Sequence, residues 1–82
     1  MLTGPQIRAA RALLGWSARE TAIISGISLP TIQRLEQNNS VSPTAQSRTI
    51  ADLKRAFEEA GVEFIGTPDN GPGVRLKPKD QH

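Results

Sequence analysis

The sequence predicts a small, mainly α-helical domain of four helices that is followed by a short β-hairpin. Apolar residues recur at helical spacing in four segments within the first 60 residues. Residue types that start helices (Ser, Thr) and that end them (Gly, Asn) separate these segments. After Gly61, apolar residues recur at every second position, which is typical of strands.

The first helix is expected over residues 4–14. Thr3 can cap it by accepting a hydrogen bond from a first-turn amide. Pro5 is tolerated in that turn because no intrahelical donor is needed there. Gly15 ends the helix, since glycine readily takes the left-handed conformation found at helix ends.

The second helix is expected at about residues 18–24. It begins with the capping box SARE, in which Ser17 and the glutamate three positions later each satisfy a backbone amide. Because so short a helix does not persist alone in water, it must pack against its neighbours. We expect Ala22 and one of Ile23 or Ile24 to make these contacts.

The third helix is expected at about residues 28–37, with Ser28 as its cap. Ile32 and Leu35 share one face, which predicts that this face packs on the core. The opposite side is left for solvent or a partner, and it carries Thr31, Gln33 and Arg34.

Residues 38–47 consist mostly of polar turn formers and predict a loop. The fourth helix is expected at about residues 47–60, because Leu53 and Phe57 keep the helical period and Gly61 can close it.

The remaining chain predicts a hairpin of two short strands around an eight-residue loop, GTPDNGPG. Asp69-Asn70-Gly71 in this loop is interpreted as a turn rather than a calcium site, because no later ligands follow at the required spacing. We therefore expect a helical domain at residues 1–61, a hairpin at 62–77 and a disordered tail at 78–82.

The composition and the motifs that are missing limit the classes of function that this sequence predicts. The 82 residues include no cysteine and carry a net charge of +2. Residues 1–50 hold five arginines and two glutamates, whereas residues 51–82 hold five basic and six acidic groups, so a polyanion would meet the first half. No membrane-spanning run or secretory signal is evident, which predicts a soluble cytoplasmic protein. No nucleophile–base pair, metal cluster or cofactor motif is visible, so we expect neither an enzyme nor a bound cofactor.

Two helices joined by a short turn that contains glycine form a helix-turn-helix unit, which presents its second helix outward. An α-helix fits the major groove of B-DNA, and residues near its N-terminus reach the base edges. The third helix is therefore the expected recognition helix.

The residues also resemble a known family. The pattern Arg11-x-x-x-Gly-Trp-Ser, followed by Glu20-x-Ala-x-x-x-Gly-Ile-Ser and Thr31-Ile-x-x-Leu-Glu36, is similar to that of Cro-type (lambda-repressor-like, xenobiotic-response-element) helix-turn-helix domains over about residues 3–60. The resemblance implies a sequence-specific transcriptional regulator. It also implies a structural ion pair between Arg11 and Glu36, which ties the first helix to the third.

Position by position, the resemblance implies which residues meet double-stranded DNA. Arg34 suits guanine and Gln33 suits adenine, since each side chain can pair bidentately with the respective base. The caps of the second and third helices would lie near phosphates. The implied DNA-binding residues are Ser17, Arg19, Ser28, Leu29, Pro30, Thr31, Gln33 and Arg34.

The chain departs from the family pattern at Ala18, Thr21 and Gln37, where glutamine, leucine and glycine are usual. It also lacks Lys and Arg between Arg34 and Arg48, where many relatives hold phosphate. A single domain should therefore bind DNA weakly, because each phosphate contact adds affinity.

These departures lead to two expectations about partners. The first is a homodimer on a palindromic operator, formed through the fourth helix or the hairpin. The second is an alternative function for the same fold, a protein-binding module such as an antitoxin or an anti-activator. The hairpin side chains expected at the dimer interface are Val62, Phe64, Val74 and Leu76.

Overall fold

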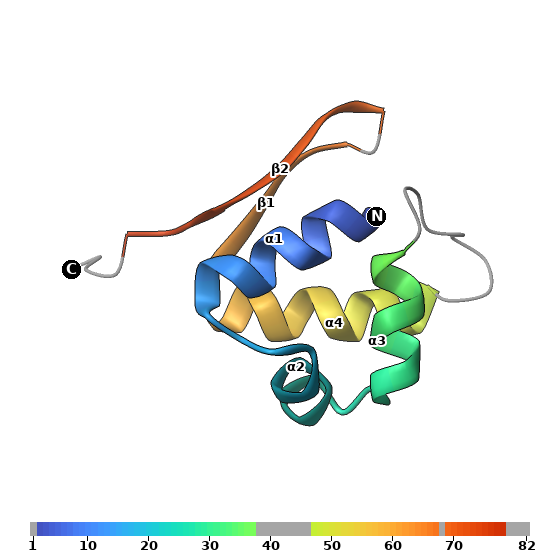
Figure 1. The fold of residues 1–82 in the computed structure, drawn as a ribbon. Coiled ribbons are helices and arrows are strands. Elements are labelled where there is room, and N and C mark those ends of the chain that lie inside the picture. The colour runs from blue at the N-terminus through green and yellow to red at the C-terminus, as the bar shows by residue number, and fades with distance from the viewer. Residues whose placement is uncertain (1, 38–46, 68, 79–82) are drawn as a thin grey trace.

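A computed structural model of the chain describes residues 2–37, 47–67 and 69–78. Within these residues the chain is mainly α-helical and ends in an antiparallel hairpin, which confirms the predicted order of elements (Figure 1). Residues 38–46 of the predicted loop and residues 79–82 of the predicted tail lie outside the described residues, and Ser47 already belongs to the fourth helix. The elements are α1 (Gly4–Leu14), α2 (Ala18–Ser25), α3 (Leu29–Glu36), α4 (Ser47–Glu59), β1 (Val62–Thr67) and β2 (Asn70–Leu76).

The first two helices start and end as their local sequence predicts. Thr3 Oγ1 accepts a hydrogen bond from the Gln6 amide at 3.2 Å, and Thr3 N donates to Gln6 Oε1 at 3.0 Å. The same reciprocal arrangement opens α2, where the Glu20 amide donates to Ser17 Oγ at 3.0 Å. Gly15, with a φ of 71°, ends α1 in the left-handed conformation.

A single core lies between α1, α3, α4 and the start of the hairpin. Phe57 at its centre stacks on Trp16, with 5.6 Å between ring centroids, and meets the edge of Phe64 at 6.0 Å. Trp16 thus covers the joint between α1 and α2. The buried apolar residues are Leu2, Ile7, Ala10, Ile32, Leu35, Ile50, Leu53, Phe57 and Val62.

Helix α2 packs differently from the prediction. Thr21 is fully buried, whereas Ile23 is 74% exposed and Ile24 is 52% exposed. Neither isoleucine is buried, so the prediction that one of them packs in the core is wrong. The physical reason is that α2 approaches its neighbours through the small side chains Ala18, Thr21, Ala22 and Ser25, which recur at helical spacing and form its inner face.

The hairpin lies against α1 and α4, on the side away from α2 (Figure 1). Its strands are longer than predicted: pairing runs from Val62 opposite Leu76 to Thr67 opposite Asn70, so the connection is much shorter than eight residues. An irregularity at Gly66 interrupts the register. Glycine is required there, because φ is 75° and a Cβ would lie 2.1 Å from the Gly71 carbonyl oxygen.

One polar side chain joins the hairpin to the first helix. Gln6, which is almost fully buried, donates from Nε2 to the carbonyl oxygens of Gly73 at 3.0 Å and Ile65 at 3.4 Å. Its Oε1 meanwhile accepts the Thr3 amide. Both ends of the Gln6 amide group are thus satisfied, which allows it to be buried.

Candidate nucleic-acid interface

The helix predicted to meet DNA, α3, has two distinct faces. Ile32, Leu35 and Glu36 are buried on the inner face. The outer face is a stripe of exposed side chains at the spacing i, i+3, i+4, i+7, which we call the α3 stripe. It contains one arginine and no carboxylate, and its members are Pro30, Gln33, Arg34 and Gln37.

Two arginines of α1 hold the C-terminal end of α3. Arg11 forms a bidentate pair with the Glu36 carboxylate, from Nε to Oε2 at 2.6 Å and from Nη2 to Oε1 at 3.0 Å. Arg8 Nη1 donates to the main-chain carbonyl oxygen of the same glutamate. Both arginines place positive charge at the helix end where the dipole is negative.

The Arg11–Glu36 pair is the ion pair that the family resemblance implied. The Glu36 side chain is 10% exposed and that of Arg11 is 23% exposed. The hydrogen bond with Glu36 raises the pKa of Arg11 above its ordinary value, against the opposing effect of burial. Arg11 Nη1 also donates to the Trp16 carbonyl oxygen at 3.1 Å, so the guanidinium links α1, the α1–α2 joint and α3.

The N-terminal end of α3 is less constrained. Ser28 occupies the cap position, but its hydroxyl makes no bond to a helix amide. Instead, Ser28 Oγ donates to Thr31 Oγ1 at 2.9 Å. The prediction that Ser28 is the N-cap residue of α3 is confirmed, but its side chain makes no capping hydrogen bond. Because the two hydroxyls bond to each other at the surface, the Ser28 hydroxyl accepts no hydrogen bond from a first-turn amide of α3.

The eight residues predicted to bind DNA all reach the surface, and they come from two helices that pack against each other. Ser17 and Arg19 lie exposed at the start of α2. Leu29 and Thr31 are half-buried, and the remaining four are exposed: Ser28, Pro30, Gln33 and Arg34.

The prediction omitted Gln37, which the structure places at the end of the α3 stripe. Its position seven residues after Pro30 is the signal that identifies it. Thr21, which stands where the family usually has leucine, is buried with its hydroxyl satisfied, since Oγ1 donates to the Ser17 carbonyl oxygen at 2.9 Å.

The four side chains predicted at a dimer interface are mostly directed inward. Val62 is fully buried, and Phe64 and Val74 pack against the core. Leu76, at 46%, is the exposed member of the four. On the outer face of the hairpin, Glu63 and Arg75 pair at 2.8 Å as the acidic and basic residues of facing strands.

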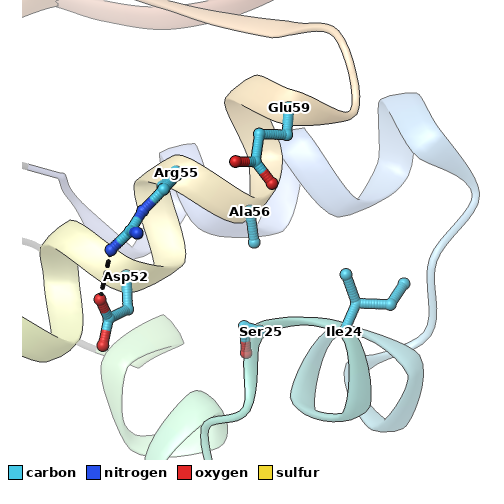
Figure 2. Close-up of a pocket in the computed structure, with 6 residues that line it drawn as sticks. All are labelled: Ile24, Ser25, Asp52, Arg55, Ala56 and Glu59. Atoms are coloured by element: carbon cyan, nitrogen blue, oxygen red, sulfur yellow. Dashed lines mark hydrogen bonds and ion pairs between the residues drawn. The ribbon is translucent and has the colours of Figure 1, made fainter.

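A second surface lies between α2 and α4. Figure 2 shows Ile24 of α2 on one side of a shallow hollow and Ala56 and Glu59 of α4 on the other, and Ser25 also lines the hollow. At one side of it, Arg55 and Asp52 form an exposed ion pair at 2.8 Å. Ile24, which lines this hollow, is 52% exposed, and its neighbour Ile23 is 74% exposed.

Within the described ranges, no group of three or more His, Cys, Asp or Glu side chains is placed to hold a metal ion. In the same part of the chain, no helix is long and apolar enough to cross a membrane. No protein-family model matches the chain, and no curated protein matches it either.

Proposed function

We propose that this chain is a sequence-specific DNA-binding transcriptional regulator, in which α2 and α3 act as a helix-turn-helix of the lambda-repressor-like kind. The α3 stripe enters the major groove, and two chains bind a palindromic operator as a homodimer. The observation that carries the proposal is the α3 stripe itself: a carboxylate-free, amide- and arginine-bearing surface on a helix whose opposite face is anchored in the core.

Each exposed group has a defined task in this proposal. Arg34 donates two hydrogen bonds to guanine O6 and N7, and Gln33 pairs with adenine N6 and N7. Leu29 and Pro30 offer apolar contact to a thymine methyl group. The residues that meet the phosphate backbone and fix the register are Ser17, Arg19, Ser28 and Thr31.

The test is a substitution at the centre of the stripe. Selection of bound sites from random DNA identifies the preferred sequence, and titration then measures its affinity. Arg34→Ala should weaken binding to that sequence by about 1–3 kcal/mol and relax the preference at one base pair of each half-site.

Arg75→Ala is the matched control, because it removes the same charge from the hairpin, where Arg75 pairs with Glu63. It should leave the base preference unchanged. If Arg34→Ala weakens binding equally on every sequence, Arg34 contacts a phosphate rather than a base. If the chain selects no sequence at low salt, the regulator proposal fails.

A second candidate function is a protein-binding module on the same fold, such as an antitoxin or an anti-activator. The exposure of both Ile23 and Ile24 favours it, since adjacent apolar side chains at the surface mark interaction sites. Ile23→Ser/Ile24→Ser should abolish binding of such a protein partner while DNA affinity stays unchanged. Loss of DNA binding in this variant would instead connect α2 to the DNA site.

A further inference from the structure

The hollow between α2 and α4 contains none of the residues that the proposed contacts with DNA use. We call it the α2–α4 hollow, and its lining residues are Ile24, Ser25, Asp52, Arg55, Ala56 and Glu59. Ile24 lies on one side of it, and Ala56 and Glu59 lie on the other (Figure 2). Glu59 follows Ala56 by one helical turn, so its carboxylate borders the same side of the hollow. The hollow thus combines apolar side chains with a carboxylate at its margin.

The size of the α2–α4 hollow suits one side chain of a partner. Its volume is about 220 Å³. Pockets that hold whole small molecules are larger, at roughly 300–1,000 Å³. Ile24 in the hollow and Ile23 beside it are both exposed, and adjacent apolar side chains at the surface are typical of a contact with another protein. The size and the apolar surface therefore favour a protein partner over a small-molecule ligand.

Glu59 gives the α2–α4 hollow a negative charge that no other residue of its lining balances. Asp52 and Arg55, the other two charged residues of the lining, neutralise each other in their ion pair. Glu59 forms no ion pair within the described parts of the chain. The last turn of α4 contains no basic residue, and the negative end of the helix dipole lies there. A cation supplied by a partner would therefore stabilise this carboxylate.

We propose that the α2–α4 hollow binds a lysine or arginine side chain of a different protein. The aliphatic stem of that side chain lies on Ile24 and Ala56, and its cationic head pairs with Glu59. An apolar residue next to it in the partner covers Ile23. The inference adds the binding site and the chemistry of the partner to the second candidate function, the protein-binding module, and it rests on that function.

The charge of the hollow disfavours other occupants. A nucleic acid would bring phosphates to Glu59, and two copies that met through this hollow would bring two Glu59 carboxylates to one interface. Lys77 lines a different hollow with Glu58 and Glu59 but forms an ion pair with neither, and its charge acts on Glu63. The complementary positive charge therefore comes from another protein.

The experiment selects peptides from a random library displayed on phage, with the full chain as bait. The wild-type chain should enrich peptides in which a lysine or arginine stands next to an apolar residue. Glu59→Lys should enrich Asp or Glu at the same place, because the charge of the hollow is then reversed. Glu58→Lys is the matched control, since it makes the same change one residue earlier, at an exposed side chain that does not line the hollow. It should enrich the same peptides as the wild-type chain.

Fluorescence anisotropy with one peptide that the wild-type chain enriched measures the affinities. Glu59→Lys should weaken binding at least about tenfold and Glu58→Lys by less than about twofold. Circular dichroism should show unchanged helix content, since both side chains are exposed.

The outcomes separate this inference from the function on which it rests. If Ile23→Ser/Ile24→Ser abolishes peptide binding while Glu59→Lys leaves it unaltered, the second candidate function stands and the inference about the hollow fails. Equal losses in the two glutamate variants would also overturn the inference, because the effect would then come from overall charge and not from the hollow. A library that yields no enriched peptide would overturn both.

Discussion

Helices α2 and α3 are both eight residues long, yet they are fixed at opposite ends. Helix α2 is closed at its start by a capping box from its own sequence, between Ser17 and Glu20. Helix α3 has no side-chain cap at its start, and it is held at its end by Arg8 and Arg11 of α1.

The difference teaches which interactions position each helix. Local sequence is enough to start α2, because both capping partners lie within four residues. The position of α3 depends on tertiary contacts that reach Glu36 from residues 25 and 28 positions away. Anchoring at the far end leaves the first turn of α3, with Leu29 and Pro30, available to a ligand.

The largest expected effect comes from breaking the ion pair between Glu36 and Arg11, which holds the end of α3. Glu36→Gln should lower the free energy of unfolding by about 3–5 kcal/mol, because Arg11 is left as a partly buried charge without its partner. Urea denaturation measures the change. Asp52→Asn is the control, since it breaks an exposed ion pair and should cost at most about 1 kcal/mol. Equal losses of unfolding free energy in the two variants would show that the pair at Glu36 stabilises the fold no more than the exposed pair at Asp52.

A smaller effect separates the two helix starts. Ser17→Ala should destabilise the protein by about 1 kcal/mol, because an amide of α2 loses its acceptor. Ser28→Ala should change stability by less than about 0.5 kcal/mol, since the Ser28 hydroxyl bonds to Thr31 and not to an amide. Thermal unfolding of the two variants side by side tests this, and a larger loss at Ser28 would show that α3 is also fixed at its start.

The smallest expected effect concerns the pair between Glu63 and Arg75, which is also an arginine–glutamate pair but lies at the surface. The hydrogen bond from Arg75 lowers the pKa of Glu63 below the ordinary value of a glutamate. A lowered pKa in the folded state means that the pair stabilises the fold at neutral pH and loses this effect as the pH falls through the folded-state pKa. NMR titration of the Glu63 carboxyl carbon should give a midpoint below that of an ordinary glutamate, and Arg75→Gln should return it toward that ordinary value. A midpoint that does not move in Arg75→Gln would assign the shift to another cause.

The order and bounds of the helices could be predicted because their signals are local. Thr3, Ser17, Gly15 and Gly26 mark helix starts and ends within a few residues of chain. The outward positions of Gln33 and Arg34 also follow from helical spacing, because Ile32 and Leu35 share the inner face. The exposure of Gln33 and Arg34 agrees with that spacing.

The features that could not be predicted depend on how elements meet. Hydrophobicity favoured burial of an isoleucine in α2, but the helix packs by small residues, so both Ile23 and Ile24 face outward. In the hairpin, Gly66 permits a register irregularity that periodicity does not detect, which made paired residues look like a loop. Gln6 contacts Ile65 and Gly73, which lie 59 and 67 positions later in the chain, and no sequence pattern predicts contacts at that separation.

The two arginine contacts to Glu36 affect which substitutions this protein can accept. Arg8 binds the main chain and Arg11 binds the side chain of the same residue, while no side chain of the α3 stripe takes part in either contact. Substitutions in the α3 stripe therefore leave both of these contacts, which hold the end of α3, in place. New ligand preferences can arise there, by evolution or by design, without a matching loss of stability.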